Sequence, residues 1–159
     1  MKLVVLNFLF LMLFISCKSV TNAEKSIPEE IIEERGKMDL PLKAKVGNLS
    51  NEVDSVLNLK IKSVNLSGNY LEIEFTYRGG CELHDFEFIG SSKIAKSMPP
   101  VRAVQLVHSV KKPDLCKKMV IQKIKIDVSE LAYKKESGSE IFLSIQGWDE
   151  KVKYVFEAN

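Results

Sequence analysis

Two segments decide the fold: GGCELHDFEF at residues 79–88 and VQLVHSVKKPDLC at residues 104–116. Each contains a short alternation of apolar and polar residues, which is typical of a β-strand with one buried face. In the first segment Phe86 and Phe88 occupy the apolar positions, next to acidic residues. Residues 91–100 between the segments have the serine and proline content of a turn. The sequence therefore predicts an antiparallel hairpin.

The two segments also contain both histidines of the chain and two of its three cysteines. They read Cys81-x-x-His84 and His108-x7-Cys116. If the strands pair with their apolar residues on one face, His84 lies directly opposite His108. We therefore expect these four side chains to gather at one end of a sheet.

Similar alternation recurs on both sides of this hairpin, at residues 57–61, 71–77, 120–128, 141–145 and 152–156. About seven short strands and no long amphipathic helix predict an all-β fold, an antiparallel immunoglobulin-like β-sandwich over residues 49–159. A small barrel of five or six strands is the alternative. Residues 127–131 are expected to carry the chain from one sheet to the other.

The N-terminus has the pattern of a signal peptide. Lys2 precedes an apolar run at residues 3–15, and Ser16-Cys17 follows. A run shorter than a membrane span that ends at a small residue before cysteine predicts a lipoprotein signal peptide over residues 1–16, with lipidation by acyl chains such as palmitate at Cys17. A transmembrane anchor and an ordinary secretory signal are the alternatives, since Phe14 stands where lipoprotein signals prefer leucine.

Residues 17–48 are expected to be a polar tether between the lipid and the domain, because they are rich in glutamate and poor in large apolar side chains. Within the tether, Ser26-x-x-Glu29 and the later Gly36 predict a short helix of about two turns. A helix this short is marginal in water unless it docks on the domain.

Charge limits the class of partner. Cleavage after Ser16 removes Lys2 and leaves 143 residues with 22 basic against 21 acidic side chains. Such a chain forms one domain, and its near neutrality argues against nucleic acid as a partner. The expected partners are the membrane, through the N-terminal lipid, and an envelope protein or glycan. The expected location is the cell envelope, at the outer membrane.

Two interpretations of the clustered cysteines and histidines remain open. In the first, Cys81 and Cys116 form a disulfide, because an exported chain whose Cys17 is lipidated has two thiols left. That bridge would close a loop of about 35 residues and contribute roughly 3–4 kcal/mol in the chain-entropy model. This interpretation requires no cofactor.

In the second interpretation, Cys81, His84, His108 and Cys116 bind a metal, since two thiolates and two imidazoles suit zinc, and thiolates also suit copper. A mixed form keeps the disulfide and holds a metal through the two histidines and a carboxylate, such as Asp85 or Asp114.

We expect no enzyme and no catalytic residues. The pairs His84-Asp85 and His108-Ser109 suggest a triad, but adjacent strand residues point to opposite faces and cannot form one. The sequence has no glycine-rich phosphate loop, metalloprotease helix motif or nucleophile elbow. Trp148 is expected to fold back on the sheet from a hairpin turn.

A longer pattern runs through the central part of the chain: Tyr77-x-Gly79-Gly80-Cys81-x-x-His84-x-Phe86, then Pro99-Pro100, Leu106-x-His108, Asp114-x-Cys116 and Ile126-Asp127-Val128-x-x-Leu131. It resembles uncharacterised small lipoproteins of Bacteroidota, sandwich domains that are distantly similar to NigD-like proteins. The resemblance covers about residues 57–131. It implies an envelope location rather than an activity, and it fits either the disulfide or the metal interpretation.

Overall fold

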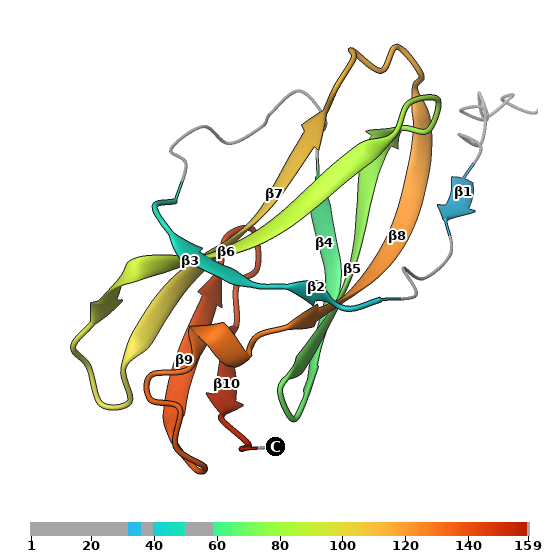
Figure 1. Cartoon of the computed structure of the whole chain (residues 1–159). Coiled ribbons are helices and arrows are strands. Elements are labelled where there is room, and N and C mark those ends of the chain that lie inside the picture. Colours follow the sequence, from blue (N-terminus) through green and yellow to red (C-terminus); the bar gives the residue numbers. More distant parts are fainter. Residues whose placement is uncertain (1–31, 36–39, 50–58, 159) are drawn as a thin grey trace, which may run out of the picture.

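The computed structural model describes residues 32–35, 40–49 and 59–158, which form two five-stranded sheets (Figure 1). One sheet has the order β1-β8-β5-β4, with β2 also paired to β8, and the other has the order β10-β9-β7-β6-β3. The strands are β1 Ile32–Arg35, β2 Leu42–Lys43, β3 Lys45–Gly47, β4 Lys60–Ser67, β5 Tyr70–Gly79, β6 His84–Ala95, β7 Val101–Val110, β8 Lys118–Asp127, β9 Glu140–Ile145 and β10 Lys151–Val155. Among the described residues, no helix is long and apolar enough to cross a membrane.

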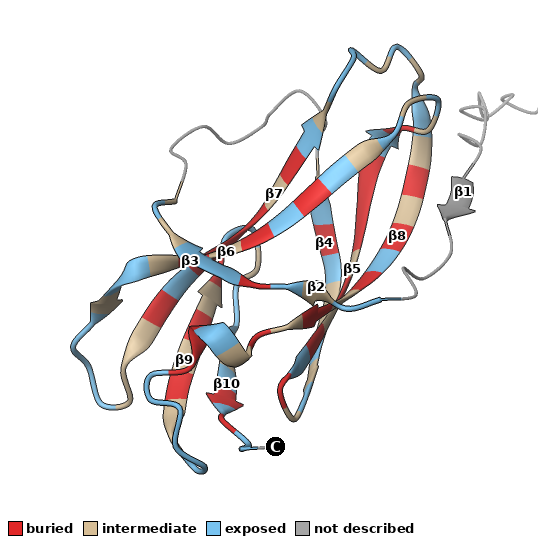
Figure 2. Ribbon diagram, viewed as in Figure 1, coloured by how far each residue is buried: buried red, intermediate tan, exposed pale blue. Residues whose placement is uncertain are grey.

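The apolar faces of the two sheets meet in one core, as the alternation predicts (Figure 2). Phe86 and Phe88 are buried and their acidic neighbours are exposed. The ring of Phe86 on β6 lies 5.0 Å from that of Phe75 on β5, so aromatic packing joins the sheets directly. Trp148 also packs against this core from the turn between β9 and β10, as expected.

Strand pairing differs from the antiparallel immunoglobulin-like arrangement that we expected. The sheets are mixed, because β7 and β9 pair in parallel, and β1, β2 and β3 each join a sheet in parallel. A parallel pair needs a crossover connection. Here β8 in the opposite sheet and the short 3-10 helix η1, Ser129–Leu131, provide it between β7 and β9. The passage between sheets therefore lies at residues 127–131, as predicted.

The domain begins earlier in the chain than the sequence indicated. The sequence places residues 42–47 in the tether, yet β2 pairs with β8 and β3 pairs with β6. Ile32–Arg35 lie within the expected helix, yet they form strand β1 beside β8. The rest of the predicted helix, the signal peptide and Cys17 lie outside the described residues. These short strands form because their backbone pairs with strands from distant parts of the chain. A local sequence pattern does not reveal such a partner.

The hairpin of β6 and β7 keeps the predicted face but shifts in register. His84 pairs with Val110 and His108 pairs with Phe86, two positions away from the direct pairing of the histidines that we expected. An even shift leaves every side chain on its face, so the core residues are unaffected. The turn is also shorter, because β6 continues to Ala95 through a register irregularity between Gly90 and Ile94.

Candidate functional site

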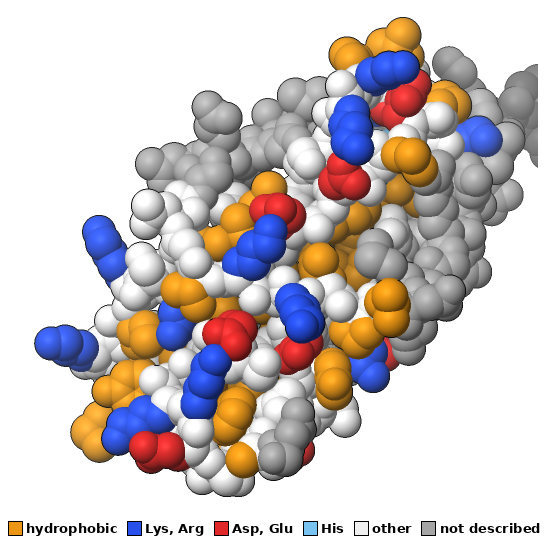
Figure 3. All heavy atoms as spheres, in the orientation of Figure 1, with side chains coloured by type: hydrophobic (Ala, Val, Ile, Leu, Met, Phe, Trp, Pro, Cys, Tyr) orange, Lys and Arg blue, Asp and Glu red, His pale blue; other side chains and the backbone are white. Residues whose placement is uncertain are grey.

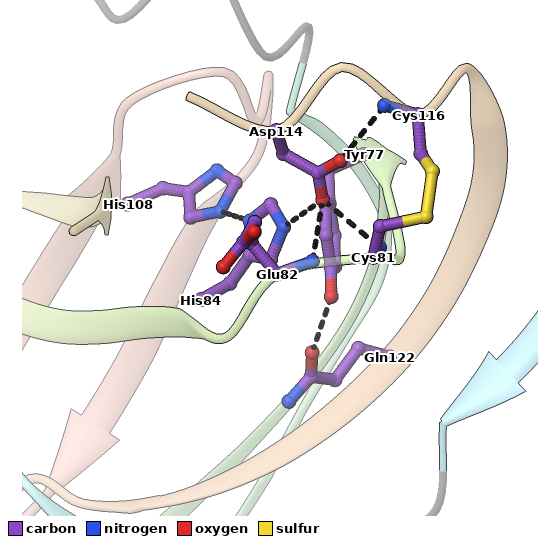
Figure 4. A network of polar contacts seen from close by, with 8 residues as sticks. All are labelled: Tyr77, Cys81, Glu82, His84, His108, Asp114, Cys116 and Gln122. Carbon is purple, nitrogen blue, oxygen red and sulfur yellow. Dashed lines mark hydrogen bonds and ion pairs between the residues drawn. A yellow bond between two sulfur atoms is a disulfide. The ribbon is translucent and has the colours of Figure 1, made fainter. Parts of the chain in front are cut away.

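Two connections between the sheets meet at one end of the molecule. Residues 80–83 lead from β5 to β6, and residues 111–117 lead from β7 back to β8. Figure 4 shows side chains from both connections converging with two histidines from the adjoining strands. We call residues 79–84 and 111–117, together with His108, the stapled corner.

A disulfide between Cys81 and Cys116 joins the two connections, with their Cα atoms 5.9 Å apart (Figure 4). It confirms the Cys81–Cys116 pairing of the first interpretation. The loop that it closes contains the whole β6–β7 hairpin, so the bond ties the ends of this hairpin to the sheet that contains β5 and β8.

Asp114 is the centre of the hydrogen bonding in the stapled corner. Its Oδ2 accepts the backbone N–H groups of Cys81 and Glu82, each at 3.1 Å, and its Oδ1 accepts that of Cys116 at 2.8 Å. The His84 ring nitrogen Nε2 lies 2.9 Å from Asp114 Oδ2. The carboxylate therefore holds both connections and one strand, and its side chain is 0% exposed.

The charge state of Asp114 follows from these contacts. Burial by itself raises the pKa of a carboxyl group, but the hydrogen bonds from His84 and from three backbone N–H groups outweigh it. The pKa of Asp114 consequently lies well below its usual range, and the carboxylate is ionised at neutral pH. An ionised carboxylate only accepts hydrogen bonds, so the His84 Nε2 carries a proton.

The two histidines form a second link in this chain of contacts. His84 Nδ1 and His108 Nε2 lie 2.6 Å apart, and the ring centroids are separated by 4.8 Å. When His84 is neutral with its proton on Nε2, its Nδ1 accepts a hydrogen bond from the Nε2–H group of His108. The histidines meet despite the register shift, because residues displaced by two positions on a facing strand are diagonal neighbours on the same face.

Aromatic rings separate the histidines from the rest of the core. Phe86 stacks on His108 with ring centroids 4.6 Å apart, and Tyr77 lies 4.6 Å from His84 and 4.9 Å from His108. The Tyr77 hydroxyl donates to Gln122 Oε1 at 3.3 Å, which directs its polar end away from the imidazoles. The pair is thus enclosed by aromatic carbon and by the disulfide-linked connections.

Gly79 explains part of the glycine-rich sequence before Cys81. A Cβ atom at this position would lie 2.8 Å from both Asp114 Oδ2 and His84 Nε2, and the residue has φ of +150°. Any side chain would displace the bonded pair and strain the backbone. Glycine is therefore required for the close approach of β5 to the His84–Asp114 contact.

The four predicted metal ligands are not arranged as one tetrahedral set. Among the described residues, the ligand atoms of Cys81, Asp114 and Cys116 lie within 4.8 Å of one another, but both sulfur atoms belong to the disulfide and are not thiolates. The histidine nitrogens that face this cluster bind Asp114 and each other. Asp85, an alternative carboxylate, lies exposed on the opposite face of β6.

The sequence suggests Asp114 only as one possible carboxylate ligand of a metal and does not predict its central place in the corner. One local signal was present: an aspartate directly after proline and two residues before Cys116 favours a turn in which its side chain accepts the backbone N–H two positions later. The bonds to Cys81, Glu82 and His84 come from segments at least 30 residues away and leave no local signal.

Comparisons with known proteins add one structural likeness. No protein-family model matches the chain, and no curated protein sequence matches it. Among solved structures, the chain is similar to a NigD-like immunity protein from Bacteroides caccae, with a TM-score of 0.47 and 13% sequence identity. The match covers 72% of this chain and 58% of that one, so this chain spans less than two thirds of its length.

Proposed function

We propose that the chain is a lipid-anchored lipoprotein of the cell envelope, whose β-sandwich-like domain acts as a non-enzymatic binding or structural module. The observation that carries this proposal is the apolar run at residues 3–15 directly followed by Ser16-Cys17. The Cys81–Cys116 disulfide supports export, because disulfides persist in oxidising compartments outside the cytoplasm.

The geometry of the stapled corner supports a structural role for its polar groups. Asp114 and His84 have side chains that are 0% and 1% exposed, and they bind each other and the backbone. A general base must reach a proton of its substrate within hydrogen-bond distance. Ser109, the hydroxyl next to His108 in sequence, lies on the opposite face of β7. The corner therefore serves to fix two connections relative to each other.

Acylation tests the first half of this proposal. Cells that express the full chain are labelled with an alkyne analogue of palmitate, and the label is read on the purified protein. We expect labelling of the parent protein and none of the Cys17→Ala variant, which should also leave the detergent phase on partitioning. A matched Cys81→Ala/Cys116→Ala variant should keep its label. Detergent partitioning by the Cys17→Ala variant would contradict the lipid anchor.

Metal analysis separates this proposal from the metal-handling alternative. Protein purified from the envelope without chelator should show the Cys81 and Cys116 peptides linked before reduction and no stoichiometric zinc or copper. If both thiols react as free after chelation, and stability falls with metal removal, the structural interpretation of the corner fails, because metal binding and folding would then be one equilibrium.

A further inference from the structure

Two leucines are exposed on the stapled corner. Leu83 is 80% exposed and Leu115 is 88% exposed, although each directly adjoins a residue of the buried network. A single exposed apolar residue is ordinary. These two come from different connections, and the bond from Glu82 N to Asp114 Oδ2 and the Cys81–Cys116 bridge place their neighbours in contact. The corner thus exposes one leucine from each of its two connections.

Basic side chains accompany the leucines. Lys111, Lys112 and Lys117 are exposed on the β7–β8 connection, and none forms an ion pair with another residue in the described part of the chain. The charge of Asp114, which lies between them, is taken up by His84 and backbone N–H groups. In Figure 3 hydrophobic side chains and side chains of both charges lie close together at the end of the molecule that carries these connections. Within the corner, the three exposed lysines outnumber the one partly exposed acidic side chain, that of Glu82.

The fold also holds this surface rigid before any partner arrives. The disulfide and the Asp114 hydrogen bonds fix the backbone on both sides of Leu115, and the bond to Glu82 fixes the residue before Leu83. Loops that are already ordered lose little conformational entropy on binding. The buried His84–Asp114 network therefore acts as the support for an exposed apolar and basic tip.

The direction of strand β1 relates this tip to the lipid anchor. β1 runs parallel to β8, and its first residue, Ile32, pairs with Met119 at the beginning of β8. Strand β1 therefore begins beside the end of β8 that is nearest to Cys116, which is the end where the stapled corner lies (Figure 1). Cys17 precedes Ile32 by 15 residues, which span at most about 50 Å when fully extended.

We propose that the stapled corner is a membrane-docking tip that rests on an anionic bilayer. Leu83 and Leu115 enter the interfacial layer, and Lys111, Lys112 and Lys117 contact lipid phosphates. This inference rests on the proposed lipid anchor, which holds the chain at a membrane. The first described strand after that anchor, β1, begins at the same end of the domain as the tip. The complementary charge is that of an anionic headgroup, so the attraction weakens with salt.

The test places a single tryptophan at the tip and measures its depth. In the full chain with Trp148→Phe, Leu115→Trp is compared with a matched control, Met98→Trp. Met98 is fully exposed on the β6–β7 turn, at the opposite end of that hairpin. Lipidated protein is reconstituted in vesicles of phosphatidylcholine and phosphatidylglycerol that carry brominated acyl chains, which quench tryptophan only at close range.

We expect quenching of Leu115→Trp to exceed that of Met98→Trp by at least about twofold, with emission shifted to the blue. Adding Lys111→Glu, Lys112→Glu and Lys117→Glu should reduce it to the level of the control, as should high salt. Equal quenching of both tryptophans in folded protein would overturn the proposal. So would a tip that stays unquenched and is instead protected by a co-purifying protein, since the surface would then be a protein interface. If Leu115→Trp does not fold, Leu83→Trp reports in its place.

Flotation separates this inference from the proposed function. The Met98→Trp control that also carries Lys111→Glu, Lys112→Glu and Lys117→Glu reports the lipid anchor alone, because its tip is disabled and its Cys17 is kept. If the control does not float, the anchor proposal fails, and unlipidated Leu115→Trp is mixed with the same vesicles. Quenching in that mixture supports the tip without the anchor, and its absence overturns both.

Discussion

Each end of β5 is held by a buried polar side chain, Asp114 at one end and Asn69 at the other, and the chemistry of the two ends differs. At one end Asp114 binds three backbone N–H groups and His84, next to a disulfide. At the other end Asn69 accepts the Tyr154 hydroxyl at 2.8 Å and Glu157 N–H at 3.1 Å, and donates to Glu157 O at 2.7 Å. The second fastening is neutral and has no covalent bond.

The difference follows from what each end must hold. At the Asn69 end, a short turn between β4 and β5 meets the segment after β10. Burial raises the pKa of Tyr154 to about 12, helped by the charges of Asp127 and Glu157, so its hydroxyl remains a donor. At the corner, two longer connections cross between the sheets, and ordering each of their residues is opposed by conformational entropy. The comparison indicates that the longer connections need the stronger fastening.

Removing the carboxylate should have the largest effect. Asp114→Ala leaves His84 and three backbone N–H groups without their acceptor, and breaking a buried charged pair costs about 3–5 kcal/mol. Urea denaturation at neutral pH measures the loss. The control is Asp85→Ala, an exposed carboxylate on the other face of β6, which should change stability by less than about 0.5 kcal/mol. Equal effects at the two positions would remove the basis for the comparison.

Removing the disulfide should be the next largest effect. The Cys81→Ala/Cys116→Ala variant opens a loop with a sequence separation of 35, for which the chain-entropy model gives about 3–4 kcal/mol. Thermal unfolding of the parent and the variant measures it, and reduction of the parent should reproduce the shift. A loss below about 1 kcal/mol would mean that Asp114 holds the corner without covalent help.

The neutral fastening should contribute less. Asn69→Ala removes the acceptor of Tyr154 and Glu157 N–H, and unsatisfied buried groups of this kind cost about 1–3 kcal/mol. Chemical denaturation measures the change, with the exposed Asn65→Ala on β4 as control. If Asn69→Ala destabilised the domain more than Asp114→Ala, charge would not distinguish the two ends.

Lowering the pH should weaken the contribution of Asp114 to stability but not that of Asn69. Near neutral pH this effect is smaller than those of the three substitutions above. The pKa of Asp114 is lowered in the folded state, so its stabilising contribution is complete above the unfolded value of about 3.9 and is lost as pH falls toward the folded value. We expect the stability difference between the parent and Asp114→Asn to shrink below about pH 4. The difference between the parent and Asn69→Ala should stay constant over the same range, because an amide does not titrate.

Several features of the site could be predicted from the sequence because they depend on local rules. Alternation placed Phe86 and Phe88 in the core and His84 and His108 on one face. A two-residue error in register did not matter for these residues, since the side chains of a strand repeat every second position. The Cys81–Cys116 disulfide was one of the two interpretations that the sequence left open.

What the sequence alone determined is therefore which face of each strand is buried, whereas it left the disulfide and the metal site as alternatives for Cys81 and Cys116. Tertiary structure decided which strands are neighbours: the parallel pairing of β7 with β9, the entry of residues 42–47 into both sheets, and the contact of Asp114 with Cys81 and His84. Alternation is a property of one segment, and it is the same whichever strand lies beside it. Neighbours are selected by the packing of two faces and by hydrogen bonds between distant segments, and these exist only once the chain has folded.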